Sequence, residues 1–424
     1  MNKVLKLSEI FEQKNEKVGN LDIRPFSCTN EGIFPRDEKF SKKLSKSLAK
    51  NKIANKGDFV FGMSRKILNY GMMRYEEGCF SGAYKVYKCK FGYEFSIFLD
   101  LYIKFNHDYF YQCIVGGARE GQSISEDILF DLEVEVPTED QLKNILKFYH
   151  IIDEQIKLKE EIIYNLEEIS KTIFNSWFID FDPVRAKIDG KPTGLSREIS
   201  DLFPDSFEDS ELGEIPKGWE YCAISNKYDF LSGYAFKSKD WTEEGVPVVK
   251  IKSIQSGFID LDTDTFVTEE FLGTKSSYIL NEGDLLIAMT GATIGKVGIV
   301  PISTEKPLLN QRVGKFIHKD NTKNFFLDCF VSSEVFLKNI ENLATGSARD
   351  NISKDQILSI KTVIPADDIY IKFGEITEDI RKKILNAQHE NQILETLRDT
   401  LLPSLLSNDL KIPNIENFIE EAGI

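Results

Sequence analysis

The sequence of 424 residues lacks an uninterrupted apolar run of about 18 residues, so no helix is expected to span a bilayer. No apolar core of signal-peptide length precedes Ser8 and Glu9, which argues against secretion. The six cysteines and four histidines are widely dispersed, and no Cys-x-x-Cys occurs. This favours free thiols in a reducing cytoplasm over a zinc or iron–sulfur site, although dispersed ligands can still converge in space.

Motifs of known catalytic sites are largely missing as well. Residues 291–297 (GATIGKV) have three residues between the glycines and a valine after the lysine, unlike a phosphate-binding loop. No Gly-x-Ser-x-Gly occurs. Paired carboxylates such as Asp367 and Asp368 stand at expected helix starts, where a favourable interaction with the helix dipole explains them. The sequence thus contains neither of these two catalytic motifs.

Acidic residues outnumber basic ones, 68 to 53, giving a formal net charge of −15 that argues against indiscriminate coating of DNA. Basic residues gather in residues 1–90, which hold 19 Lys and Arg against 10 Asp and Glu. The lysines between positions 39 and 56 suit phosphate contacts or, equally, a solvated helix face. Local contact with DNA is therefore compatible with an acidic chain.

The chain repeats itself. Residues 117–129 (GAREGQSISEDIL) are similar to residues 346–358 (GSARDNISKDQIL). From Ile124 and Ile352 onward, matching positions of the two copies are 228 residues apart. Upstream, Gly57-Asp58 matches Gly283-Asp284 at an offset of 226. Two homologous halves are the simplest interpretation.

Each half continues into a helical pattern with apolar residues spaced 3.5 positions apart over four heptads, which predicts a coiled-coil helix. The patterns start at Ile145 and Phe373. About 30 residues would give each helix a length of roughly 45 Å. Pro403 is expected to end or kink the second helix early.

The two nearly neutral segments, about 1–144 and 219–366, mix strand-like and helical patterns. Residues 285–289, 296–300 and 313–317 predict strands, and residues 325–342 predict one helix. A duplicated α+β domain with a helical arm on each copy accounts for these patterns.

The centre and second half of the sequence resemble the specificity subunits of type I restriction–modification systems. Residues 177–187 (WFIDFDPVRAK), 202–207 (LFPDSF) and 210–219 (SELGEIPKGW) are similar to that family's central region and to the beginning of its second target-recognition domain. Residues 232–236 (SGYAF) and 346–353 (GSARDNIS) resemble motifs near the beginning and end of that domain. The first half lacks counterparts of the Pro-x-Gly-Trp and Ser-Gly-x-x-Phe motifs.

This resemblance implies an α+β fold. Two homologous mixed α/β target-recognition domains in a pseudo-two-fold arrangement would be separated by two long antiparallel coiled-coil helices. The expected divisions are a first target-recognition domain over 1–144, a first spacer helix over 145–181, a central connector over 182–215, a second target-recognition domain over 216–366, a second spacer helix over 367–408 and a C-terminal tail over 409–424.

The resemblance further implies a non-catalytic subunit that reads a bipartite, asymmetric target on double-stranded DNA. Its partners would be two modification subunits, which supply S-adenosylmethionine and adenine N6-methylation, and restriction subunits, which use ATP and Mg. No cofactor is expected in this chain, and no membrane contact. Helices of about 45 Å could hold two recognition domains about one DNA turn apart on the same face of the duplex, since one turn is about 34–36 Å.

Two other classes of function remain open at this point. The acidic net charge is compatible with a duplicated coiled-coil interaction scaffold that never binds nucleic acid. An enzyme whose site is assembled from dispersed residues is the other alternative.

Direct readout of DNA uses Arg or Lys for guanine, Asn or Gln for adenine, and small apolar groups for the thymine methyl. Residues 310–312 (NQR) are three consecutive side chains of these types. Alternatively, they are turn residues that lead into the next strand. Loops at matching places in both halves are better candidates than any single residue, and Tyr234 and Phe236 also suit a core. The candidate DNA contacts are Arg36, Lys43, Arg65, Lys66, Arg119, Tyr234, Lys237, Lys252, Thr290, Thr293, Asn310, Gln311, Arg312 and Arg349.

Overall fold

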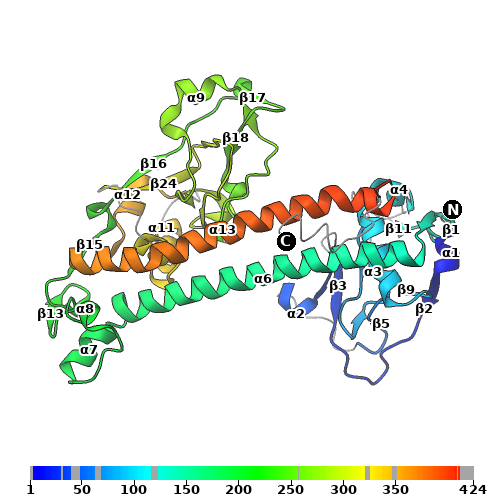
Figure 1. The fold of residues 1–424 in the computed structure, drawn as a ribbon, viewed down its shortest axis with the longest axis horizontal. Coiled ribbons are helices and arrows are strands. Elements are labelled where there is room, and N and C mark those ends of the chain that lie inside the picture. The colour runs from blue at the N-terminus through cyan, green and yellow to red at the C-terminus, as the bar shows by residue number, and fades with distance from the viewer. Residues whose placement is uncertain are drawn as a thin grey trace. The chain divides into compact units, whose positions relative to one another are not determined.

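The computed structural model describes residues 3–29, 32–39, 48–62, 68–115, 123–255, 257–319, 325–345, 351–407 and 409–410. The chain divides into two compact units, which we call unit 1 (residues 1–156 and 394–424) and unit 2 (residues 157–393). Two long helices, α6 (Glu139–Phe178) and α13 (Asp367–Leu406), each contribute one end to each unit (Figure 1).

Unit 1 is built on a four-stranded sheet with the order β2-β9-β6-β7, and four two-stranded sheets (β1-β12, β3-β4, β5-β8 and β10-β11) surround it. Its strands are β1 (Lys3–Lys6), β2 (Phe11–Lys14), β3 (Phe26–Thr29), β4 (Gly32–Pro35), β5 (Lys52–Asn55), β6 (Phe59–Phe61), β7 (Tyr70–Met72), β8 (Glu77–Phe80), β9 (Lys85–Cys89), β10 (Ile114–Val115), β11 (Ser123–Ile124) and β12 (Glu133–Val136). Its shorter helices are α1 (Leu7–Ile10), α2 (Arg36–Lys39), α3 (Tyr93–Phe105), α4 (His107–Tyr111) and α5 (Glu126–Asp131).

Unit 2 has a five-stranded sheet, β16-β24-β21-β22-β19, and a four-stranded sheet, β17-β20-β18-β23, with two strand pairs, β13-β14 and β15-β25. Its strands are β13 (Phe207–Ser210), β14 (Gly213–Pro216), β15 (Glu220–Ala223), β16 (Tyr228–Ser232), β17 (Trp241–Thr242), β18 (Val246–Val249), β19 (Gly257–Phe258), β20 (Phe266–Val267), β21 (Leu285–Ala288), β22 (Val297–Ile299), β23 (Leu308–Leu309), β24 (Val313–His318) and β25 (Lys361–Ile364). Its shorter α-helices are α7 (Asp182–Ile188), α8 (Arg197–Ser200), α9 (Glu270–Thr274), α10 (Phe326–Val331), α11 (Glu334–Thr345) and α12 (Lys354–Leu358), and its 3₁₀-helices are η1 (Ile224–Asn226), η2 (Ser238–Asp240), η3 (Ile251–Ser253), η4 (Ser276–Tyr278) and η5 (Gly291–Thr293).

The two units share one core topology, which confirms the duplication predicted from the sequence. Strands β2, β9, β6 and β7 of unit 1 take the same order as β16, β24, β21 and β22 of unit 2. The neighbouring strands also pair in the same sense, because all three pairings are antiparallel in unit 1 and in unit 2. Unit 2 adds β19 at the edge, parallel to β22. The expected α+β class is therefore confirmed.

The prediction of a single helix over residues 325–342 is wrong. The structure has α10 and α11, interrupted at Ser332 and Ser333. The Ser333 hydroxyl donates to the carbonyl of Phe330 at 2.6 Å and accepts from the backbone N–H of Phe336 at 3.3 Å. Serine at this position begins a new helix because its side chain replaces a missing backbone partner.

The two long helices are longer than the roughly 30 residues that their pattern predicts. Each spans 40 residues, or about 60 Å at 1.5 Å per residue. Helix α6 begins at Glu139 because Thr138 and Gln141 cap it reciprocally: the N–H of Thr138 donates to Gln141 Oε1 at 2.8 Å, and the N–H of Gln141 to Thr138 Oγ1 at 3.4 Å. The apolar pattern starts only one to two turns after Glu139, so the helix length predicted from it is too short.

Pro403 does not end helix α13, which continues to Leu406. This proline lies in the last turn, where it removes only one backbone hydrogen bond near the end of the helix. Leu402, Leu405 and Leu406 are all buried in the core of unit 1. Their burial keeps the last turn helical.

The long helices pair in an antiparallel sense inside each unit. In unit 1, Phe148 and Ile152 of α6 share a core with Leu402 and Leu405 of α13. In unit 2, the ring of Phe178 lies 5.0 Å from that of Phe373, and the Lys159 ammonium pairs with the Glu390 carboxylate. The beginning of each helix thus packs against the end of the other, which is the antiparallel pairing that the family resemblance implies.

Within the described ranges, none of the helices combines the length and the apolar character that crossing a membrane requires. The same part of the chain contains no group of three or more His, Cys, Asp or Glu side chains that could hold a metal ion.

Candidate nucleic-acid interface

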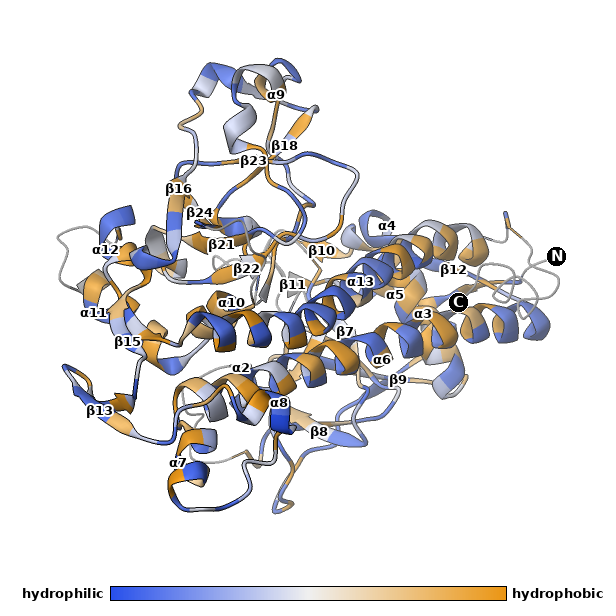
Figure 2. Cartoon of the chain, turned by 60° about the vertical axis from the view of Figure 1, so that its left-hand side comes forward, coloured by the Kyte–Doolittle hydropathy of each residue, from blue (hydrophilic) through white to orange (hydrophobic). Residues whose placement is uncertain are grey.

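Residues 310–312 lie at an edge of unit 2 where parallel strands end together. Strands β18 and β23 lie side by side (Figure 2) and pair in parallel, with Val249 opposite Leu309. The residues that follow them, Lys250 and Asn310, therefore leave the sheet at the same edge, and the N–H of Asn310 donates to the carbonyl of Val249 at 3.2 Å. The carboxyl ends of parallel strands are a common position for ligand-binding loops.

The backbone holds Tyr234 against this edge. The N–H of Tyr234 donates to the carbonyl of Leu309 at 2.8 Å, and the N–H of Gln311 donates to the carbonyl of Tyr234 at 2.9 Å. The carbonyl of Arg312 in turn accepts from the N–H of Met289 at 3.0 Å. Backbone hydrogen bonds thus join three loops that are far apart in the sequence into one edge. The strands that these loops follow hold them in position.

Gly233 permits this close approach. A Cβ atom at this position would lie 2.2 Å from the carbonyl oxygen of Asn310, which is backbone and cannot rotate away. Residue 233 therefore has to be glycine for the loops before 234 and after 309 to meet.

Replacing Gly233 with alanine is expected to destabilise this edge by about 1–3 kcal/mol, the usual cost of forcing an extra methyl group into packed structure. Hydrogen exchange of the Tyr234 and Gln311 amides should accelerate accordingly. Gly273→Ala is the matched control, because nothing lies within 4 Å of a Cβ there. Unchanged exchange in Gly233→Ala would show that the loops can separate without cost.

The side chains of residues 310–312 differ in their exposure to solvent. Asn310 is only 5% exposed, and its Oδ1 accepts from the backbone N–H of Arg312 at 3.3 Å, so its side chain shapes the turn. The side chains of Gln311 and Arg312 are exposed. The alternatives left open by the sequence thus divide between the residues: Asn310 is a turn former, and its two neighbours are available to a ligand.

Basic side chains lie near Arg312 at this edge. Burial lowers the pKa of Lys250, and the neighbouring charges of Lys252 and, more weakly, Arg312 lower it further, whereas Asp264 raises it. The Lys250 ammonium lies 4.0 Å from the centre of the Trp241 ring, a cation–π contact. Lys252 forms an ion pair with Asp264. We call Lys250, Lys252, Gln311 and Arg312 the basic edge of unit 2.

Lys250 was not among the candidates taken from the sequence. It directly follows the buried run of β18, and residues that follow buried parallel strands lie at a ligand-binding edge. A parallel pairing of residues 246–249 with 308–309 was not visible in the sequence. Lys275, which follows α9, was also missed, because no sequence pattern brings it to Tyr234, whose ring centre lies 4.5 Å from its ammonium.

The remaining described candidates lie nearby in the chain or in unit 1. Thr290 follows β21, pairs with Asn351 in an isolated bridge and precedes the short helix η5, which contains Thr293. The hydroxyl oxygens of Thr290 and Thr293 are buried without a hydrogen-bond partner among the described residues. Lys237 is exposed, and Arg36 of unit 1 donates to Ser27 Oγ at 3.0 Å. The candidates Lys43, Arg65, Lys66, Arg119 and Arg349 lie outside the described residues.

The chain is similar to specificity subunits of type I restriction enzymes. Residues 216–396 match the family model of the type I restriction modification DNA specificity domain. The type I restriction enzyme HindI specificity subunit of Haemophilus influenzae is 25% identical over 367 residues, 74% of this chain and 77% of that protein. The MjaVIII specificity subunit of Methanocaldococcus jannaschii is 30% identical over 214 residues, which is half of each protein.

A solved structure has the same fold. The crystal structure of the type I restriction–modification system S subunit from M. genitalium superimposes with a TM-score of 0.52, at 16% identity, and covers 95% of both chains.

Proposed function

We propose that this chain, which is related to the type I restriction–modification specificity subunits and carries their DNA specificity domain over residues 216–396, reads a bipartite, asymmetric target on double-stranded DNA. It acts in the cytoplasm without a catalytic centre of its own. Two modification subunits bring S-adenosylmethionine and methylate adenine at N6, and restriction subunits bring ATP and Mg for cleavage. This chain determines where they act.

The observation that supports this proposal most is the basic edge of unit 2. Two exposed side chains, Gln311 and Arg312, are of the types that read adenine and guanine, and Lys252 stands beside them. Lysines of this kind bind phosphates and fix the register, while base contacts supply the specificity. The shared topology of unit 1 supports a second reader, which a bipartite target requires.

The surface of α6 supports a protein partner. Leu158, Ile162 and Ile169 are 51%, 42% and 48% exposed, and their spacing places them on one face of the helix. An exposed apolar stripe of this kind is typical of a surface that another helix covers. In this proposal a modification subunit covers it, so that methylation and target reading are held in one assembly.

Sequencing that detects methylated adenine tests the function directly. The comparison is between cells with and without this gene, in a strain whose modification subunits are intact. We expect one bipartite methylated motif to disappear when the gene is deleted. An unchanged set of methylated motifs would reject the proposal and favour the scaffold that never binds nucleic acid.

Two substitutions in the basic edge should distinguish residues that contribute to overall DNA affinity from residues that contribute to sequence specificity. Lys252→Ala is expected to weaken binding to all DNA sequences alike and to reduce the slope of log K against log salt by about 1. Gln311→Ala should leave that slope unchanged and reduce discrimination against a single changed base pair by about 1–3 kcal/mol.

The measurement is a salt titration of duplex binding by the complex with modification subunits, on the target found by methylome sequencing. Lys338→Ala is the matched control for Lys252→Ala, because Lys338 is also exposed and also pairs with one carboxylate, Glu334. If Lys252→Ala and Lys338→Ala behaved alike, the basic edge would not contact DNA.

A further inference from the structure

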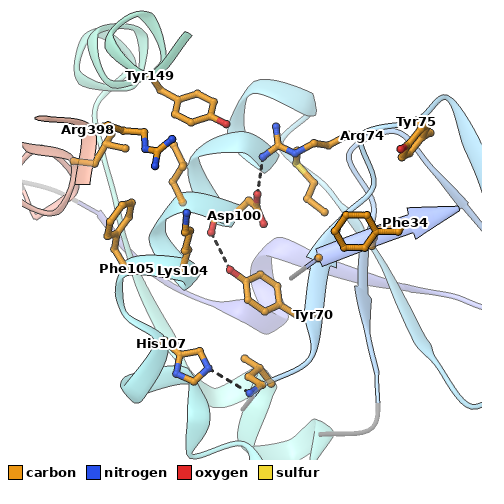
Figure 3. Close-up of a pocket in the computed structure, with 17 residues that line it drawn as sticks. Phe34, Tyr70, Arg74, Tyr75, Asp100, Lys104, Phe105, His107, Tyr149 and Arg398 are labelled. Atoms are coloured by element: carbon orange, nitrogen blue, oxygen red, sulfur yellow. Dashed lines mark hydrogen bonds and ion pairs between the residues drawn. The ribbon is translucent and has the colours of Figure 1, made fainter. Parts of the chain in front are cut away.

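Unit 1 contains a cleft whose described lining includes none of the candidate DNA contacts. Its volume is about 670 Å³, and it lies between β7, α3, the first part of α6 and the last part of α13 (Figure 3). Sites for small molecules typically have volumes of about 300–1,000 Å³. We call it cleft 1.

Cations dominate the charge of cleft 1. Arg74, Lys104 and Arg398 line it, and Asp100 is the only carboxylate among the described lining residues. Arg74 Nη2 donates to Asp100 Oδ2 at 2.9 Å, which uses the one negative charge. Arg398 has a side chain only 19% exposed and pairs with Asp399, which does not line the cleft. The lining thus carries more positive than negative charge.

Aromatic rings form the other part of the lining: Phe34, Tyr70, Tyr75, Phe105 and Tyr149. The Tyr70 hydroxyl donates to the backbone carbonyl of Asp100 at 3.1 Å, which fixes one ring at the base of the cleft. Figure 3 shows the Tyr149 ring between the guanidinium groups of Arg74 and Arg398. Flat rings beside guanidinium groups suit a ligand that is planar in one part and anionic in another.

The repeat provides an internal comparison. Unit 2 has a smaller cleft of about 300 Å³ at the matching place, which we call cleft 2. The offset of 228, established from Ile124 onward, takes Arg398 to Ser170. Extended to α3, it takes Asp100 to Asp328 and Lys104 to Ser332, and all three of these unit 2 residues line cleft 2.

Cleft 2 therefore has the opposite charge. Among its described lining residues, three carboxylates, Glu167, Glu168 and Asp328, face a single cation, Lys171. Burial raises the pKa of Glu167, and the neighbouring Glu168 raises it further, as is expected of carboxyls held together. A cavity that merely followed from the shared fold would be similar in both units. The cations of cleft 1 are thus a property of its own sequence.

We propose that cleft 1 binds a small ligand of the nucleoside phosphate class, with its phosphate at Arg74, Lys104 and Arg398 and its base against the Tyr149 and Phe105 rings. Guanidinium groups bind phosphate oxygens in a bidentate manner, and aromatic rings stack on a base. This site is separate from the basic edge and does not depend on the proposed reading of DNA.

Isothermal titration of the purified full chain tests the proposal, with adenosine monophosphate, inorganic phosphate and adenosine as three separate probes and no DNA present. We expect adenosine monophosphate to bind at least tenfold more tightly than either of the other two. Lys104→Ser and Arg398→Ser introduce the residues of cleft 2, and each should weaken that binding at least tenfold. Arg197→Ser is the matched control, because its side chain is 94% exposed and lies in unit 2.

Absence of binding by adenosine monophosphate would overturn the proposal, as would binding that both serine variants retain. Equal binding of inorganic phosphate would overturn the role of the aromatic rings. Lys104 is exposed, so Lys104→Ser keeps the test valid if Arg398→Ser fails to fold. Methylome sequencing is a separate readout, so a failure here leaves the proposed function untouched.

Discussion

Replacing Arg381 with alanine is expected to destabilise unit 2 locally by about 3–5 kcal/mol, the usual cost of leaving a buried charge without its partner. Arg381 Nη2 donates to Asp328 Oδ1 at 3.1 Å and also to the carbonyl of Gly283. The two charged side chains are only 11% and 6% exposed. This arginine therefore joins α13 to α10 and to the turn before β21, and its loss leaves Asp328 buried without its cation.

Hydrogen exchange measured by mass spectrometry is the suitable test, because a chain of two units need not unfold in one step. Amides of β21 and α10 should exchange about a hundredfold faster or more, since 1.4 kcal/mol corresponds to a factor of ten. Arg197→Ala is the matched control, because this exposed arginine also pairs with one aspartate, Asp201. Equal protection in both variants would show that the buried pair contributes no stability.

If the proposed function holds, insertion of seven residues into each long helix is expected to lengthen the gap between the two half-sites of the proposed DNA target by about three base pairs. Seven residues are two turns of a coiled coil and add about 10.5 Å, while DNA rises about 3.4 Å per base pair. The insertions belong after Lys159 and after Glu390, because these residues pair with each other across the two helices. Methylome sequencing would report the new gap with unchanged half-sites.

Four residues inserted after Lys159 alone provide the control. Four residues turn a helix by about 40° beyond one full turn, so α6 would shift against α13. The contacts of Phe174 and Phe178 with Phe373 could then not form together with the Lys159–Glu390 pair. We expect loss of assembly or an altered gap. Continued methylation at the original spacing in either variant would contradict the role of the helices as a ruler.

Much of the fold could be predicted because it is encoded in local patterns. The strands expected at 285–289, 296–300 and 313–317 correspond to β21, β22 and β24. Alternating and uninterrupted apolar runs between turn residues carry that information. The helix break at Ser333 and the early start of α6 were missed because single capping side chains decide them, and an apolar pattern does not register capping.

Spacing along the chain is enough to predict the duplication, the α+β class and the two long helices, and the motifs carry the family resemblance, which implies that the helices pair antiparallel. Which candidates meet depends on how distant segments pack. Lys250 and Asn310 are neighbours because β18 and β23 pair in parallel across some 60 residues of chain. Cleft 1 likewise joins Arg74, Tyr149 and Arg398 from distant segments. Such sites arise from packing between segments, and a single sequence has no pattern that records which segments will pack.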